Sequence, residues 1–174
     1  LARWRVRSGL VSDCELQNPV PCVGAVTVAC VGRTPTAWLP SLRARLAGSA
    51  DLLRQDGSSA AWCKCRRRLT GSDVLITVSA ATDDDPSTLA AATAADARRS
   101  GVFSVAVLVV PSVFYDLPGF KDEAETRALH RRIERLRAAA DRCLIPAAYY
   151  RRSPDFAVDA VAGLVATIGQ GSGI

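Results

Sequence analysis

Three runs of apolar, largely β-branched residues constrain how this chain can fold. They are VGAVTVACVG (23–32), DVLITVSA (73–80) and VFSVAVLVV (102–110). Such runs are typical of strands buried on both faces of a parallel sheet. Helical segments separate them and the connections are short, so right-handed β-α-β crossovers are expected. The sequence therefore predicts a three-layer α/β fold, in which helices cover both faces of a mainly parallel, Rossmann-like sheet.

Apolar residues recur at helical spacing in the segments between and after these runs. Helices are predicted over 36–57, 87–101, 127–144 and 153–174. In the first, leucines 39, 42, 46 and 53 share one face, and the second is rich in alanine. In the third, one apolar stripe consists of Leu129, Ile133, Leu136, Ala140, Cys143 and Leu144. A short strand is predicted in CLIPAAYY (143–150). AAWCKCRRRLTG (60–71) fits either a short strand or an irregular stretch.

Length and composition indicate one globular domain. The chain has 174 residues, 49% of them hydrophobic and 22% charged, which suits a single full-sized core. Residues 1–22 are predicted to form an N-terminal edge strand and loop, and residues 23–174 the domain. No apolar run reaches the roughly 18 residues needed to cross a bilayer, no secretory signal is recognisable, and the six cysteines are expected to be reduced thiols. We therefore expect a cytoplasmic protein.

Ligands of open parallel sheets bind at the carboxyl ends of the strands. The loops expected there are 32–36, 79–85, 111–119 and 146–153, and the second contains three consecutive aspartates, Asp83, Asp84 and Asp85. Two roles are open for them. Asp84 or Asp85 can cap the next helix, with Pro86 in its first turn, or the three can hold a divalent cation, which prefers clustered carboxylates. The cap is the favoured hypothesis, and no metal site is predicted.

Five segments, in order, resemble the nucleotide-binding half of FtsZ, the bacterial tubulin homologue. VTVACVG (26–32) is similar to the first strand and glycine loop of that family, and LTGSDVLITVSA (69–80) to the strand before its glycine-rich signature loop. RRSGVFSVAVLVVPSVFYD (98–116) is similar to the next strand of that family and the loop after it. IERLRAAADRCLIP (133–146) is similar to a later helix–strand segment, and DFAVDAVAGLVATIGQGSGI (155–174) to the start of the long central helix.

The resemblance implies nucleotide-binding positions, but most of them are altered. FtsZ holds phosphates with Gly-Gly-Gly-Thr-Gly-Thr-Gly, whereas this chain has SAATDDDPST (79–88). Alanine, proline and threonine limit the close backbone approach that glycine allows, and carboxylates repel a polyphosphate. The implied vestigial positions are Gly32, Arg33, Thr34, Ser79, Ala80, Thr82, Asp83, Asp84, Asp85, Ser87, Thr88, Tyr115, Asp116, Phe156 and Asp159.

This pattern implies a divergent, truncated FtsZ-like protein without GTPase activity, catalytic residues or a cofactor. Its expected role is to bind a protein partner or to self-associate, in a setting linked to cell division. An alternative is that it binds GTP or GDP, with Mg²⁺ held by Asp83, Asp84 and Asp85.

Basic residues support another alternative, a module that binds nucleic acid or an anionic membrane surface. The formal net charge is +5, and the basic groups are Arg3, Arg5 and Arg7, then Lys64 to Arg68, then Arg151 and Arg152. Solvated groups spread around the surface are the favoured interpretation. His130, the only histidine, has no sequence partner that indicates a catalytic triad, so a surface or packing role is predicted.

Overall fold

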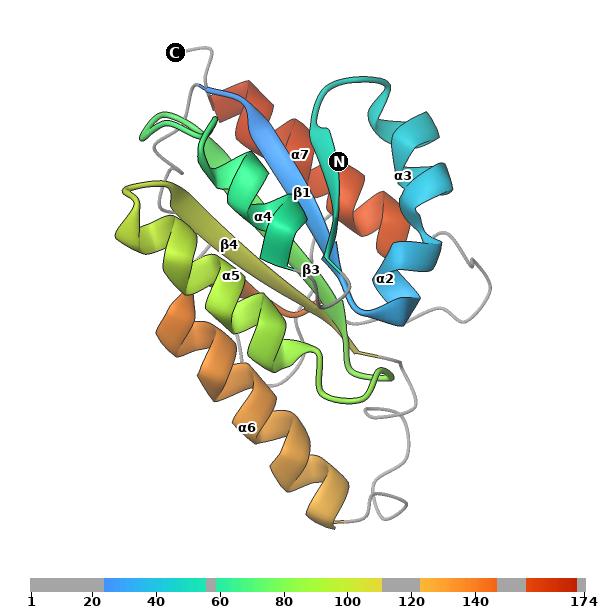
Figure 1. Cartoon of the computed structure of the whole chain (residues 1–174). Helices are drawn as coiled ribbons and strands as arrows, with labels where there is room; N and C mark the ends of the chain where they lie inside the picture. Colours follow the sequence, from blue (N-terminus) through green and yellow to red (C-terminus); the bar gives the residue numbers. More distant parts are fainter. Residues whose placement is uncertain (1–23, 56–58, 111–122, 147–155, 172–174) are drawn as a thin grey trace.

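The computed structural model describes residues 24–55, 59–110, 123–146 and 156–171 (Figure 1). Five strands form one sheet in the order β2-β1-β3-β4-β5, and every neighbouring pair is parallel. Helices α3 and α7 pack together on one face of the sheet, while α4, α5 and α6 cover the other (Figure 1). This arrangement confirms the predicted three-layer α/β fold.

The three apolar runs form the centre of the sheet, as predicted. They are β1 (Val26–Val31), β3 (Val74–Ala80) and β4 (Phe103–Val109), and all their residues except Phe103 are buried. β3 lies between the other two, with Val74 opposite both Val26 and Phe103. Helices meet both faces of these strands, so the strands are largely apolar and show no alternation of apolar and polar residues. The edge strands are β2 (Asp51–Gln55) and β5 (Arg142–Leu144).

The helices follow the strands in chain order. They are α2 (Arg33–Ala37), α3 (Leu39–Leu46), α4 (Ser59–Arg66), α5 (Ser87–Arg99), α6 (Glu123–Ala139) and α7 (Phe156–Gly171). Leu129, Ile133 and Leu136 of α6 are buried, and the predicted apolar set of α7 is buried from Val158 to Ile168. Within the described ranges, no helix combines the length and the hydropathy that a bilayer crossing needs.

The predicted helix over 36–57 is wrong in its second half. The helix ends at Leu46, and Leu53 lies in β2 opposite Ala29. Ala47 (φ 48°) and Gly48 (φ 84°) adopt left-handed conformations there, which is a common way for helices to end. Leu53 fits the helical spacing of the earlier leucines only by coincidence.

The structure also decides the predictions for residues 59–66 and for Cys143 and Leu144, whereas other predicted segments lie outside the described residues. Residues 59–66 form helix α4, where a strand or an irregular stretch was expected. Cys143 and Leu144 were assigned to the helical stripe of α6, but they belong to β5 because α6 ends at Ala139. The predicted strand near the N-terminus, the loop 111–119 and most of the loop 146–153 lie outside the described ranges.

A second, smaller apolar cluster attaches α4 to the sheet. Trp62 and Cys65 are buried in it, together with Ala29, Leu75, Ala97 and Val102. The Trp62 Nε1 group donates a hydrogen bond of 2.8 Å to Asp96 Oδ2 of α5. Arg66 Nη1 donates to both oxygens of the same carboxylate at 3.0 Å. Helices α4 and α5 are therefore joined by both apolar and polar contacts.

The cysteines that the structure describes are free thiols, and three of the four are buried: Cys30, Cys65 and Cys143. Burial raises the pKa of Cys30 to about 12, so this thiol stays protonated at neutral pH. Cys30 and Cys143 were expected to pack as small hydrophobic residues, and their burial confirms this. Cys63 is exposed on α4.

Candidate functional site

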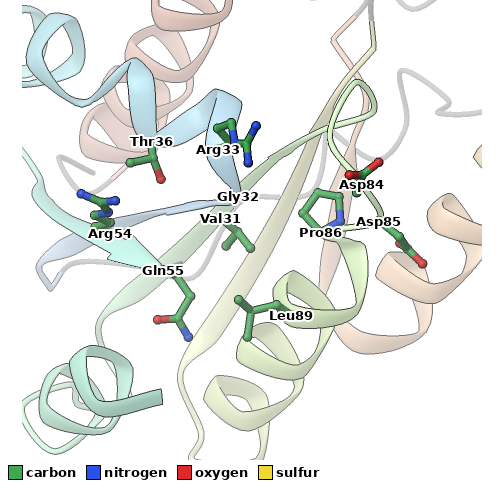
Figure 2. Close-up of a pocket in the computed structure, with 10 residues that line it drawn as sticks. All are labelled: Val31, Gly32, Arg33, Thr36, Arg54, Gln55, Asp84, Asp85, Pro86 and Leu89. Carbon is green, nitrogen blue, oxygen red and sulfur yellow. The ribbon is translucent and has the colours of Figure 1, made fainter. Parts of the chain in front are cut away.

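A pocket of about 460 Å³ opens at the carboxyl ends of β1 and β2 (Figure 2). In the sheet order β2-β1-β3, the chain continues from β1 to β2 on one side of β1 and then crosses to β3 on the other side. Such a switch point is where open α/β sheets bind ligands, and the volume is typical of a small-molecule site. The lining residues are Val31, Gly32, Arg33, Thr36, Arg54, Gln55, Asp84, Asp85, Pro86 and Leu89.

Two arginines line the side of the pocket formed by β1, α2 and β2. Arg33 is the first residue of α2 and Arg54 lies near the end of β2, and both are exposed. Arg33 makes no ion pair with any residue inside the described ranges. Guanidinium groups bind carboxylate and phosphate through paired hydrogen bonds. This side of the pocket therefore offers positive charge.

The floor of the pocket contains buried polar atoms. Gln55 is only 1% exposed, and its Nε2 donates a long hydrogen bond of 3.4 Å to Thr93 Oγ1. Gln55 Oε1 and Thr36 Oγ1 are buried without a hydrogen-bond partner in the described part of the chain. A buried polar atom without a partner costs about 1–3 kcal/mol. Such atoms are rare in folded proteins and call for an explanation.

The carboxylate of Asp83 lies against the start of α2. Its Oδ2 accepts a hydrogen bond of 2.9 Å from Thr34 N, and its Oδ1 accepts one from the Thr34 hydroxyl. Gly32 has φ 92°, and a Cβ there would lie 2.6 Å from Asp83 Oδ2, so this turn requires glycine. In a phosphate loop a bound anion lies at this end of a helix. Here the chain's own carboxylate occupies the position.

Replacing Asp83 with alanine is expected to lower the free energy of unfolding by about 1 kcal/mol, which is typical for the loss of a helix N-terminal cap. Urea unfolding at equilibrium measures this difference. Asp83→Asn keeps an oxygen acceptor for Thr34 N, so it should lose less than Asp83→Ala. Equal losses for both variants would contradict the capping role.

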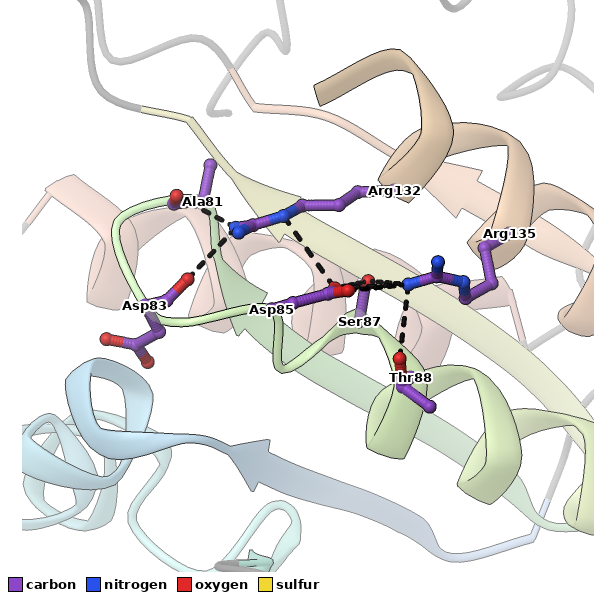
Figure 3. Close-up of polar contacts among 7 residues, drawn as sticks. All are labelled: Ala81, Asp83, Asp85, Ser87, Thr88, Arg132 and Arg135. Atoms are coloured by element: carbon purple, nitrogen blue, oxygen red, sulfur yellow. Dashed lines mark hydrogen bonds and ion pairs between the residues drawn. The ribbon is translucent and has the colours of Figure 1, made fainter. Parts of the chain in front are cut away.

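Two arginines of α6 hold the loop after β3 from the other side (Figure 3). Arg132 Nη1 donates to the carbonyl oxygens of Ala81 and Asp83 at 2.9 and 3.0 Å. Arg135 Nη1 donates to both carboxylate oxygens of Asp85 at 3.1 and 3.0 Å. It also donates to the hydroxyl groups of Ser87 and Thr88, at 2.8 and 3.1 Å. The loop is thus fixed to α6 as well as to α2.

Asp85 is both strained and strongly bound. Its φ of 26° lies in the left-handed region, which costs a non-glycine residue about 1–2 kcal/mol. Burial alone would raise the pKa of its carboxyl group. Hydrogen bonds from Ser87 and Arg135 outweigh this effect, together with the positive charges of Arg135 and Arg132, and the pKa is lowered from 3.8. The Asp85 carboxylate is therefore charged at neutral pH and fixes the strained residue to α6.

The favoured role of the aspartates, a cap on the following helix, is wrong. The N-cap of α5 is Pro86, with no side-chain capping hydrogen bond, because the Asp85 carboxylate is bound to Arg135 of α6 (Figure 3). The three carboxylates also do not converge. Asp83 binds α2 and Asp85 binds α6, while Asp84 lines the pocket without a bond to either helix. Within the described ranges, no three His, Cys, Asp or Glu residues gather as a metal site would require.

The structure places the other predicted site residues in several locations. Thr82 approaches Thr34 (Oγ1–Oγ1 3.5 Å), so the loops after β1 and β3 meet as expected. Ser79 and Ala80 are buried at the end of β3. Asp159 forms an ion pair of 2.6 Å with Arg45, which joins α7 to α3, and neither Asp159 nor Phe156, the first residue of α7, lines the pocket. Tyr115 and Asp116 lie outside the described residues.

Sequence reasoning missed Arg54 and Gln55, which line the pocket from β2. The region was predicted to be helical, which removed both residues from the sheet. Gly48 was the available signal, because a glycine after an apolar helical stretch indicates a helix end. His130 is exposed on α6, which agrees with the predicted surface role and not with a packing role.

Comparisons with known proteins find likeness in structure and none in sequence. No protein-family model matches the chain, and no curated protein matches its sequence. Its fold is similar to a crystal structure of the sugar isomerase domain of an RpiR transcription factor from Sphaerobacter thermophilus, with 17% sequence identity and a TM-score of 0.49. The match covers 86% of this chain and 72% of that one.

The FtsZ-like identification is therefore wrong. No family model matches the sequence, and the structural likeness reported above is to a sugar isomerase domain. The predicted divergent FtsZ-like role in cell division and the alternative of GTP binding fail with it. Where the structure describes these five segments they form strands and helices, and alternation of strands and helices is shared by many α/β proteins. Binding of a protein partner, nucleic acid or an anionic membrane stays a prediction.

Proposed function

We propose that this protein binds a small anionic molecule in the pocket at the carboxyl ends of β1 and β2. The observation that carries the proposal is the presence of Arg33 and Arg54 in one small-molecule-sized pocket at the switch point of the sheet. A phosphate or carboxylate group on the ligand matches these two guanidinium groups. The rest of the ligand would contact the apolar side chains of Val31, Pro86 and Leu89.

This mode of binding differs from that of a phosphate loop. Asp83 already accepts the hydrogen bond of the Thr34 N–H at the start of α2, so that group is not free to hold the anion. The arginine side chains carry the recognition instead. Because both are exposed, the anionic group of the ligand is expected near the mouth of the pocket.

The double variant Arg33→Gln/Arg54→Gln tests the proposal. Hydrogen bonds to charged groups contribute about 1.5–3 kcal/mol, so the variant is expected to bind inorganic phosphate at least about tenfold more weakly than the native protein. Titration followed by amide chemical shifts in two-dimensional NMR spectra measures the affinity. In the native protein the shifts should be concentrated in residues 31–36, 54–55 and 84–89.

The matched control is Arg43→Gln, because Arg43 is an exposed arginine of α3 that does not line the pocket. It should leave the affinity unchanged. Phosphate binding that both variants weaken equally would show a general charge effect and reject the pocket as the site. Absence of phosphate binding to the native protein at millimolar concentration would reject the proposed function.

A further inference from the structure

Resting on the proposed anion-binding pocket, we infer that Asp84 makes the pocket selective for small anions that also carry an amino group. The pocket is charged on two sides. Arg33 and Arg54 come from the side formed by β1, α2 and β2, and Asp84 comes from the loop before α5 (Figure 2). An ammonium group on the ligand would match Asp84 while its anionic group matches the arginines.

Asp84 differs from the two aspartates beside it. The Asp83 carboxylate is bound to Thr34, and the Asp85 carboxylate is bound to Arg135. Asp84 is exposed and makes no hydrogen bond or ion pair within the described part of the chain. Asp85 also lines the pocket, but its carboxylate is bound to Arg135, so Asp84 is the pocket-lining carboxylate that is still available to a ligand.

The backbone on both sides of Asp84 is fixed. The Asp83 carbonyl accepts a hydrogen bond from Arg132, and the Asp83 side chain binds the start of α2. On the other side Asp85 is held at φ 26° by its contacts with α6. Backbone strain of this kind is concentrated at functional sites. A loop ordered before binding has less entropy to lose when a ligand contacts Asp84.

The charge arrangement also excludes ligands. An anion without an amino group would approach Asp84 with the same sign of charge and no compensating contact, which lowers its affinity. An anion that carries an ammonium group meets opposite charge on both sides of the pocket. Specificity of this kind combines an attractive element with a repulsive one.

Phosphoethanolamine and glycerol 3-phosphate are the probes that test this inference. They are similar in size and share a phosphate group, but the first carries an ammonium group and the second carries hydroxyl groups. The native protein is expected to bind phosphoethanolamine more tightly. In Asp84→Asn, phosphoethanolamine should bind about two- to fivefold more weakly, which corresponds to one partly exposed ion pair. Glycerol 3-phosphate should bind more tightly, because a repulsive charge is gone.

The control is Asp51→Asn, which removes an exposed carboxylate at the start of β2, away from the carboxyl ends of the strands. It should change neither affinity, and thermal midpoints of both variants verify that they are folded. Equal binding of the two probes, or the same change for both in Asp84→Asn, would overturn the selectivity and leave the anion pocket intact. If neither probe nor inorganic phosphate binds the native protein, the proposed function fails and this inference fails with it.

Discussion

Replacing Arg132 with methionine is expected to lower the free energy of unfolding by about 2–3 kcal/mol, as for hydrogen bonds made by a charged group. One guanidinium nitrogen of Arg132 donates to two backbone carbonyls of the loop after β3, and its side chain is only 18% exposed. The methionine side chain fills a similar space but donates no hydrogen bond. The carbonyls of Ala81 and Asp83 would lose their donor, and the strained Asp85 would lose one of its two arginine contacts. Urea unfolding at equilibrium measures the loss.

Arg131→Met is the matched control for this prediction. Arg131 is the preceding residue of α6, but it is exposed and has no ion pair among the described residues. Its replacement should change the unfolding free energy by less than about 0.5 kcal/mol. Hydrogen exchange adds a local measurement, because amides of residues 81–88 should exchange faster in Arg132→Met only. Similar losses in both variants would show that the loop does not depend on Arg132.

Replacing Trp62 with alanine should cost about 3–5 kcal/mol, the usual range for removal of a buried tryptophan. Trp62 is 5% exposed and is the largest side chain in the cluster that attaches α4 to the sheet. The alanine variant would leave a cavity against Leu75 and Ala97 and would remove the hydrogen bond to Asp96. Thermal or urea unfolding measures the effect, and amides of α4 should lose protection from exchange first.

Trp62→Phe separates the hydrogen bond from the packing. Burial alone would raise the pKa of Asp96, but hydrogen bonds from Trp62, Arg99 and Arg66 outweigh it and lower the pKa below 3.8. A lowered pKa stabilises the fold fully above pH 3.8, and this stabilisation is lost as the pH falls through the folded-state value. Phenylalanine removes one of these hydrogen bonds, so the variant should lose less stability on acidification than the native protein. An unchanged acid dependence would show that the bond contributes nothing to the charged form.

The central strands were predictable because their environment is uniform. Residues 74–80 and 104–109 are buried on both faces, and such a position favours apolar, β-branched residues. No distant residue is needed to recognise them. The same holds for α5 and α7, whose small or apolar residues indicate burial against a sheet.

The edge of the sheet was not predictable in this way. β2 exposes much of its length, and only Gln55 is fully buried, so its sequence has no strong strand pattern. Leu52 and Leu53 are equally consistent with an amphipathic helix. The pocket depends on β2 through Arg54 and Gln55, so an error at one edge strand was enough to hide the candidate site.

The roles of the three aspartates depend on partners far along the chain. Asp83 binds Thr34, 49 residues away, and Asp85 binds Arg135, 50 residues away. Capping rules consider only the residues next to a helix, and by those rules Asp84 and Asp85 were reasonable caps for α5. Tertiary contacts with α2 and α6 decided the outcome instead.

The pairing of β1 has a consequence for synthesis on the ribosome. Every strand pair in the sheet is parallel, and Val26 of β1 pairs with Val74 of β3. No two of these five strands can form an early hairpin, because parallel neighbours need a crossover between them. β1 therefore emerges with six apolar or β-branched residues that are buried in the finished fold, and its central partner is complete only after Ala80. A nascent chain that stalls before that residue leaves one edge of β1 unpaired even when β2 has joined its other edge. Exposed strand edges of this kind aggregate and are bound by chaperones.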